Sequence, residues 1–191
     1  MKSLKDCVGK SLTWKHSGFN LENPDELFCG EDLVAKLVWK PEYLLSSKKP
    51  IKDALKSSRK FKAEGQTKEG KWILERSGFL DGKLLAKKQN KIVGKCFYGI
   101  NKPWKTVDME LGREKFRVHQ KIGLKAKYIL EDKNEKELII FETNLVKTFT
   151  LRKGGVKIKI SQEAKSLKNL SLLVLFFFYF LNMLTWNTMM F

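Results

Sequence analysis

The sequence lacks most features that would identify a function directly. It has only three cysteines, Cys7, Cys29 and Cys96, which are odd in number and widely spaced. Neither a disulfide framework nor a CxxC zinc pattern can be built from them, so we expect free thiols in a reducing compartment. The N-terminus is basic and has no apolar stretch of the kind that a secretory signal peptide requires. We therefore expect a cytoplasmic protein.

Motifs of the common enzyme classes are also missing. GxSxG, GxGxxG, GxxxxGK[ST] and HExxH do not occur. The two histidines, His16 and His119, are far apart, and we interpret His119 as a solvated surface residue. Glu22 and Asp25 are close in sequence but are expected to lie in a turn rather than to form a catalytic dyad. We predict a non-enzymatic protein with no catalytic residue, metal, cofactor or evident small-molecule substrate.

Acidic residues are few compared with basic ones. The chain carries 38 Lys and Arg against 21 Asp and Glu, a net charge of +17, which favours anionic partners. The densest cationic stretch runs from residue 48 to residue 62. We predict that it contacts anionic phospholipid through these residues: Lys48, Lys49, Lys52, Lys56, Arg59, Lys60 and Lys62. Non-specific nucleic-acid binding ranks third among our hypotheses, with Phe97, Tyr98 and Trp104 as candidate stacking residues.

Between residues 11 and 160 the apolar positions repeat every second residue, which indicates strands with one buried face. Leu33, Ala35, Leu37 and Trp39, for example, interleave with Lys36 and Lys40. Turn residues such as Asp81-Gly82 and Gln89-Asn90 separate the strands at short intervals, as in an antiparallel meander. The exception is the segment 41–58, which is expected to be a loop with one or two helical turns. We predict a mainly β fold with about a dozen strands in one domain, residues 1–191.

The last residues of the chain, 170–191, carry no charge. As a helix they would span about 33 Å, enough to cross a bilayer core of about 30 Å. The first hypothesis is that 170–187 form an apolar helix inside a closed barrel, because a barrel of about twelve strands encloses a lumen that its own side chains cannot fill. Trp72, Phe97, Val118 and Phe149 are expected to face this helix. The alternative is a tail-anchored membrane protein with a small cytoplasmic β domain, since lysines precede the segment.

Two parts of the sequence resemble a known family. The stretch 11–39 resembles the "LTVWKKS…F…G…LVF" opening of the tubby C-terminal-like superfamily, especially its LURP-one-related branch. The matching residues are Leu12, Thr13, Trp14, Lys15, Ser17, Phe19, Gly30, Leu33 and Val34. The stretch 70–88 is similar to a "G.W…kr.GF" hairpin of bacterial members. This resemblance implies a twelve-stranded barrel threaded by an apolar C-terminal helix.

The resemblance covers essentially the whole chain but its motifs are structural. The cysteine-rich tract and the calcium-binding segment of the scramblase-like branch do not occur here, and no Lys or Arg aligns with the phosphoinositide-binding residues of tubby-type members. The fold therefore transfers more readily than any ligand. The leading hypothesis is a non-enzymatic tubby-like barrel that associates with anionic membrane surfaces, either as a cytoplasmic peripheral protein or as an anchored one.

Overall fold

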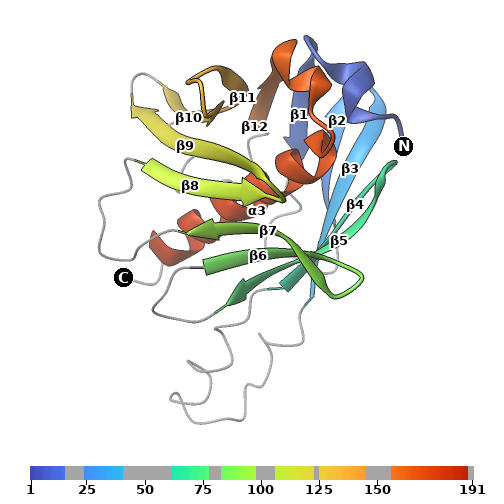
Figure 1. The fold of residues 1–191 in the computed structure, drawn as a ribbon. Coiled ribbons are helices and arrows are strands. Elements are labelled where there is room, and N and C mark those ends of the chain that lie inside the picture. Colours follow the sequence, from blue (N-terminus) through green and yellow to red (C-terminus); the bar gives the residue numbers. More distant parts are fainter. Residues whose placement is uncertain are drawn as a thin grey trace.

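The fold is a closed antiparallel β-barrel with one long helix inside it (Figure 1). The computed structural model describes residues 1–15, 24–40, 62–77, 83–97, 106–122, 125–144 and 156–188. Its twelve strands are β1 (Ser11–Lys15), β2 (Asp25–Cys29), β3 (Asp32–Trp39), β4 (Lys62–Thr67), β5 (Gly70–Ser77), β6 (Lys83–Lys88), β7 (Lys91–Phe97), β8 (Thr106–Leu111), β9 (Glu114–Ile122), β10 (Lys125–Asp132), β11 (Glu137–Asn144) and β12 (Val156–Ile160). The helices are η1 (Leu4–Cys7), η3 (Glu163–Ser166) and α3 (Leu170–Thr188).

Each strand pairs with its neighbours in sequence, and β1 pairs with β12 to close the ring. Leu12 lies opposite Ile158 on one side and Cys29 on the other, so the first strand joins the two ends of the meander. Closure leaves no strand edge unpaired. The twelve-stranded barrel predicted from the alternation is therefore confirmed, while the segment expected to be a loop, 41–58, lies outside the described residues.

The described turns use residues that suit tight antiparallel connections. Gln89 and Asn90 have φ values of 49° and 62°, the left-handed backbone that a two-residue hairpin loop requires at both positions. They connect β6 to β7 and thereby define the hairpin 83–97. A bulge in this hairpin lies between Ala86 and Lys87, so that Lys87 pairs with Ile92.

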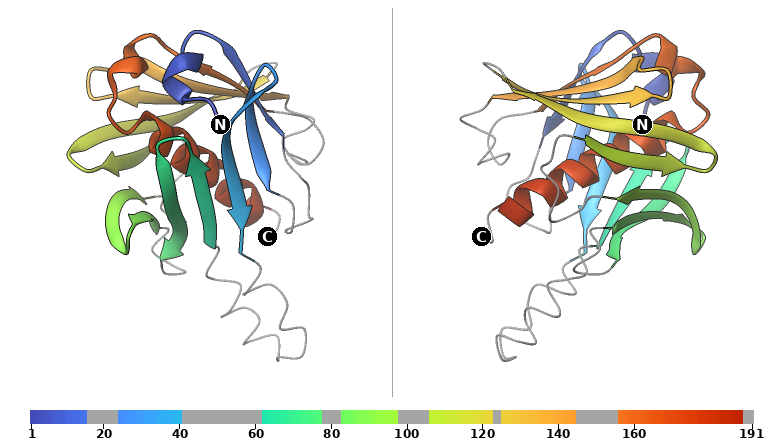
Figure 2. Two further views of the ribbon diagram at one scale, coloured as in Figure 1. Left: turned by 90° about the vertical axis from the view of Figure 1, so that its right-hand side faces the viewer. Right: turned by 60° about the vertical axis from the view of Figure 1, so that its left-hand side comes forward.

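Helix α3 fills the barrel interior, as both views of Figure 2 show. Every side chain from Leu170 to Met183 is at most 6 % exposed. Such a helix is apolar on all sides because each face meets the inner surface of the barrel. The expected apolar helix at 170–187 is confirmed at 170–188, and its burial in the barrel is the first of the two alternatives. Within the described ranges, no helix is both long enough and apolar enough to cross a membrane.

Aromatic contacts hold the helix against the wall. Trp14 of β1 stacks on Phe178 with ring centroids 3.6 Å apart, and Phe141 of β11 meets Phe177 edge-on at 4.6 Å. Gly65 of β4 allows a close approach, since a Cβ there would lie 3.0 Å from the Leu175 side chain. The inward positions expected for Trp72 and Val118 are confirmed, with both residues in the core. Phe149 lies outside the described residues.

The helix begins at the same end of the barrel as the N-terminal segment (Figures 1 and 2). Glu69, in the turn between β4 and β5, accepts hydrogen bonds from Ser3 at the N-cap of η1 and from Ser171 in the first turn of α3, the latter at 2.7 Å. Burial raises the pKa of the Glu69 carboxyl, but the hydrogen bonds from Ser3, Ser171 and Thr67 outweigh it and leave that pKa below its ordinary value. This carboxylate therefore ties together three segments that are distant in sequence.

Candidate functional site

Most of the predicted cationic stretch lies outside the described residues, namely Lys48, Lys49, Lys52, Lys56, Arg59 and Lys60. Its last member, Lys62, opens β4 and is half-buried, and its carbonyl oxygen accepts a hydrogen bond from the backbone N–H of Lys40 at 3.0 Å. The lipid-binding role assigned to these residues stays a prediction.

A second cationic region, which the sequence reasoning missed, is the hairpin of β6 and β7. It carries five lysines and no acidic residue: Lys83, Lys87, Lys88, Lys91 and Lys95. No Asp or Glu occurs anywhere between Asp81 and Asp108. We call residues 83–97 the lysine hairpin. Counting acidic residues as well as basic ones along the chain would have identified it.

Most lysines of this hairpin lack a carboxylate partner. Lys87 forms an ion pair with Glu75 of β5 at 2.5 Å. No described carboxylate forms an ion pair with the four others, Lys83, Lys88, Lys91 and Lys95. Lys83 lies 5.4 Å from the centre of the Phe97 ring and Lys88 lies 5.8 Å from that of Trp72. Four of the five hairpin lysines therefore form no ion pair within the described part of the chain.

Two large apolar side chains are exposed among these lysines. Ile92 is 50 % exposed and Phe97 is 46 % exposed. The expectation that Phe97 faces the central helix is wrong, because Gly94 and Cys96 take the inward positions of β7 and the next residue must point outward. Leu85 of β6 also faces outward but is only 6 % exposed, and it lies outside the core cluster.

The outer surface of β8 to β12 differs, because several of its cations are paired with carboxylates on neighbouring strands. Arg117 lies 4.0 Å from Asp108, and Lys121 lies 3.1 Å from Glu137. Glu142 of β11 contacts both Lys127 and Lys159 at 3.4 Å. Burial raises the pKa of the Glu142 carboxyl, but the two lysines outweigh it and leave that pKa below its ordinary value. Part of the positive charge on this surface is therefore offset by nearby carboxylates.

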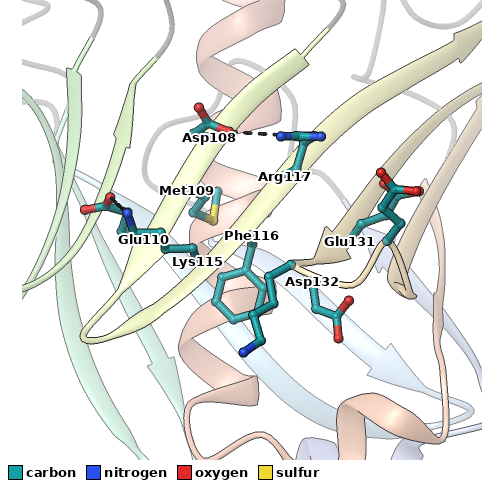
Figure 3. Close-up of a pocket in the computed structure, with 10 residues that line it drawn as sticks. Asp108, Met109, Glu110, Lys115, Phe116, Arg117, Glu131 and Asp132 are labelled. Carbon is teal, nitrogen blue, oxygen red and sulfur yellow. Dashed lines mark ion pairs between the residues drawn. The ribbon is translucent and has the colours of Figure 1, made fainter.

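A pocket of about 420 Å³ lies at the end of the β8–β9 hairpin (Figure 3). Its lining comprises Asp108, Met109, Glu110, Lys115, Phe116, Arg117, Glu131, Asp132, Lys133 and Glu135. Figure 3 shows that Asp108 points toward Arg117 and Glu110 toward Lys115, and Asp132 accepts hydrogen bonds from the backbone of Asn134 and Lys136. The pocket is lined by five carboxylates and three basic residues, so it does not suit a phosphate group.

The structure places the candidate histidine and carboxylate residues differently from what the sequence predicts. His119 is in contact with Glu131 at 3.4 Å with only 19 % of its side chain exposed, so it is less solvated than expected. Asp25 does not lie in a turn: it is buried in β2 and accepts a hydrogen bond from the Trp39 indole at 2.8 Å. Among the described residues, no group of three or more His, Cys, Asp or Glu could hold a metal ion. His16 lies outside those residues.

All three cysteines are free and buried. Burial, together with a hydrogen bond to Cys29, raises the pKa of the Cys7 thiol to about 12. Burial likewise raises the pKa of the Cys96 thiol. A thiol must lose its proton to act as a nucleophile, so these environments do not favour cysteine chemistry.

Searches of protein-family models, of curated proteins and of solved structures find no match to this chain. The architecture itself defines the class of protein, a closed twelve-stranded antiparallel barrel with a central C-terminal helix.

Proposed function

We propose that this protein is a non-enzymatic, tubby-like barrel that associates with anionic phospholipid membrane surfaces. The lysine hairpin carries the proposal, because four of its five lysines form no ion pair with a described carboxylate, whereas several cations of β8 to β12 do. The relationship to the tubby-like superfamily is part of this proposal. It is supported by the order of twelve strands and an apolar terminal helix, which is the order that the resemblance implies.

The energetics support a surface association without a specific pocket. A lysine near an anionic leaflet contributes about 1 kcal/mol. The four hairpin lysines without ion pairs could therefore give several kcal/mol together. The undescribed cations between residues 48 and 60 would add to this if they face the same leaflet. Screening by salt weakens such an interaction, since exposed charges lose most of their attraction beyond about 8 Å at physiological ionic strength.

Flotation with vesicles tests this function. One set of vesicles is phosphatidylcholine alone, and in the other part of it is replaced by phosphatidylserine. We expect the full chain to float only with the anionic vesicles. The variant Lys88→Gln, Lys91→Gln, Lys95→Gln is expected to bind about a hundredfold more weakly. Equal recovery with both kinds of vesicle would contradict the proposal.

A matched variant removes the same charge from the paired surface. Lys115, Lys121 and Lys159 are each more than half exposed and each lies within 4 Å of a carboxylate. Their replacement by glutamine lowers the net charge equally. We expect this variant to keep most of its vesicle affinity. An equal loss in both variants would show that only the total charge of the protein matters, not the hairpin.

Single-stranded nucleic acid is the second candidate for the same surface. Phe97 lies exposed beside Lys83, which is the combination that stacking platforms use. A stacking platform presents successive aromatic residues to successive bases, and Phe97 is the one large exposed aromatic residue in the described structure. An oligonucleotide that binds the full chain more tightly than anionic vesicles would favour this second function.

A further inference from the structure

The outer face of the lysine hairpin combines its charges with an apolar strip along β7. Ile92 and Phe97 are the only large hydrophobic residues besides Met1 that are strongly exposed in the described part of the chain. Val93, between them in sequence, is half-buried and packs against the core, so the strip consists of Ile92 and Phe97. Single exposed apolar residues are common on protein surfaces, but here two of them lie on the same outer face of one lysine-rich strand. The strip therefore indicates a partner that has both negative charge and an apolar interior.

The register of the hairpin surrounds this strip with lysines. Lys83 lies opposite Phe97 at one end of β7, and Lys87 lies opposite Ile92 at the other. Lys95 lies between them, opposite Leu85. Lysine stems are long enough to hold the amine in water or among head groups while the stem covers apolar surface. Phe97 and Ile92 are five residues apart, or about 17 Å along a strand.

An anionic bilayer fits this arrangement better than a second copy of the chain. Two copies meeting through their hairpins would bring ten lysines and no hairpin carboxylate together, which like-charge repulsion opposes. A bilayer supplies phosphate groups at the level of the amines and hydrocarbon just below them. The chemistry of the hairpin therefore selects a lipid surface as its occupant.

We propose that β7 lies flat on the anionic bilayer, with Ile92 and Phe97 entering the boundary between head groups and acyl chains. This inference rests on the proposed function and adds an orientation and a second, apolar contribution to it. Both side chains enter at once only when the strand is parallel to the membrane plane, because they lie at its two ends. The binding free energy then has an electrostatic contribution, which salt weakens, and an apolar contribution, which persists at high salt.

The apolar part is tested by Ile92→Ser and Phe97→Ser. Burying the exposed half of each side chain in the interface is worth about tenfold in affinity, so we expect each variant to bind anionic vesicles about tenfold more weakly. The loss should persist at high salt. The control is Phe28→Ser, an aromatic residue on the outer face of β2 that lies under Lys15 with 4.5 Å between amine and ring centre. Phe28→Ser should bind anionic vesicles as tightly as the unmodified protein does.

The orientation is tested with an environment-sensitive fluorophore on single introduced cysteines, which is selective because the native thiols are buried. Ile92→Cys and Phe97→Cys should both shift to the blue on anionic vesicles. Lys159→Cys should not, since β12 lies five places from β7 in the ring of twelve strands. A shift at only one of the two β7 positions would overturn the flat orientation.

The outcomes separate the inference from the function on which it rests. If the serine variants bind normally while the hairpin lysine variant does not, the surface association holds and the apolar insertion is wrong. If the lysine variant also binds normally, both are wrong. If Phe97→Ser loses binding to single-stranded oligonucleotide but not to vesicles, the strip serves nucleic acid and the lipid proposal fails.

Discussion

The interior of the barrel and the outer face of the lysine hairpin use opposite chemistry within one strand. On β7, Gly94 and Cys96 face inward and are fully packed, whereas Lys95 and Phe97 face outward. The interior is filled by α3, whose side chains from Leu170 to Met183 are all buried. The hairpin exterior leaves amines and two apolar side chains accessible. Changes inside should therefore alter the free energy of unfolding, and changes on the hairpin should alter binding.

The largest effect is expected from deleting α3, residues 170–188. The inward side chains of twelve strands would then face an empty lumen, which that barrel cannot close by small shifts. We expect loss of cooperative thermal unfolding and strong binding of a hydrophobic dye, or an insoluble protein. The full chain is the control. A truncated protein that unfolds cooperatively would show that the helix is not the core.

The same substitution in both regions sharpens the contrast. Phe177 is fully buried against Phe141, and Phe177→Ala is expected to lower the free energy of unfolding by about 3–5 kcal/mol. Phe97→Ala, at a residue that is 46 % exposed, should cost less than about 1 kcal/mol. Denaturant titration of both variants measures the difference. If both variants lost a similar amount of unfolding free energy, the predicted difference between interior and hairpin surface would be wrong.

Gly94→Ala tests the inner side of the hairpin alone. A Cβ at this position would lie 2.5 Å from the Leu111 side chain and 3.2 Å from that of Ala86. Overpacking of this kind typically costs about 1–3 kcal/mol. Adding Leu111→Ala should make the pair less than additive, because the smaller residue leaves room for the new methyl group. Full additivity in a double-mutant cycle would show that the crowding is not between these two residues.

The stability of the protein is expected to depend on pH through Glu69, which accepts a hydrogen bond from the first turn of α3. The folded pKa of Glu69 is below its ordinary value of 4.5, so the stability that its hydrogen bonds provide is present above that pH. It should be lost as pH falls from about 4.5 through the folded pKa. In Glu69→Gln the melting temperature should fall less steeply over this window. Glu31→Gln, at an exposed turn residue, serves as the control. An equal change in that variant would show that the pH effect does not come from the hydrogen bonds of Glu69.

The smallest effects on stability are expected from the two sets of lysine variants. The lysines of the hairpin and those of the paired surface are mostly exposed, and exposed ion pairs contribute about 0–1 kcal/mol. Replacing three of either set by glutamine should shift the free energy of unfolding by less than about 1 kcal/mol. Thermal unfolding of both variants measures this. A large loss in the hairpin variant would mean that its reduced vesicle affinity reflects unfolding.

The sequence by itself determined the strands and the terminal helix. Alternation with period two is a local property of a strand with one buried face, so it predicted β1, β3 and β12 close to their observed bounds. The uncharged segment after Asn169 predicted α3. Its composition is also a local property, since a helix that is apolar on all sides must be buried on every side. Neither prediction needed the identity of any strand's neighbour.

Only the tertiary structure decided which charges are paired and where Phe97 points. Lys95 lies opposite Glu110, but Glu110 contacts Lys115 instead, whereas Lys121 reaches Glu137 on another strand. Phe97 alternates with the inward Gly94 and Cys96 and so points outward, and the β6–β7 bulge turns Ile92 outward as well. Register, bulges and ring closure join residues that are distant in sequence. The run of lysines without acidic residues can be read from the sequence, but which of these lysines lack an ion pair depends on the closed barrel.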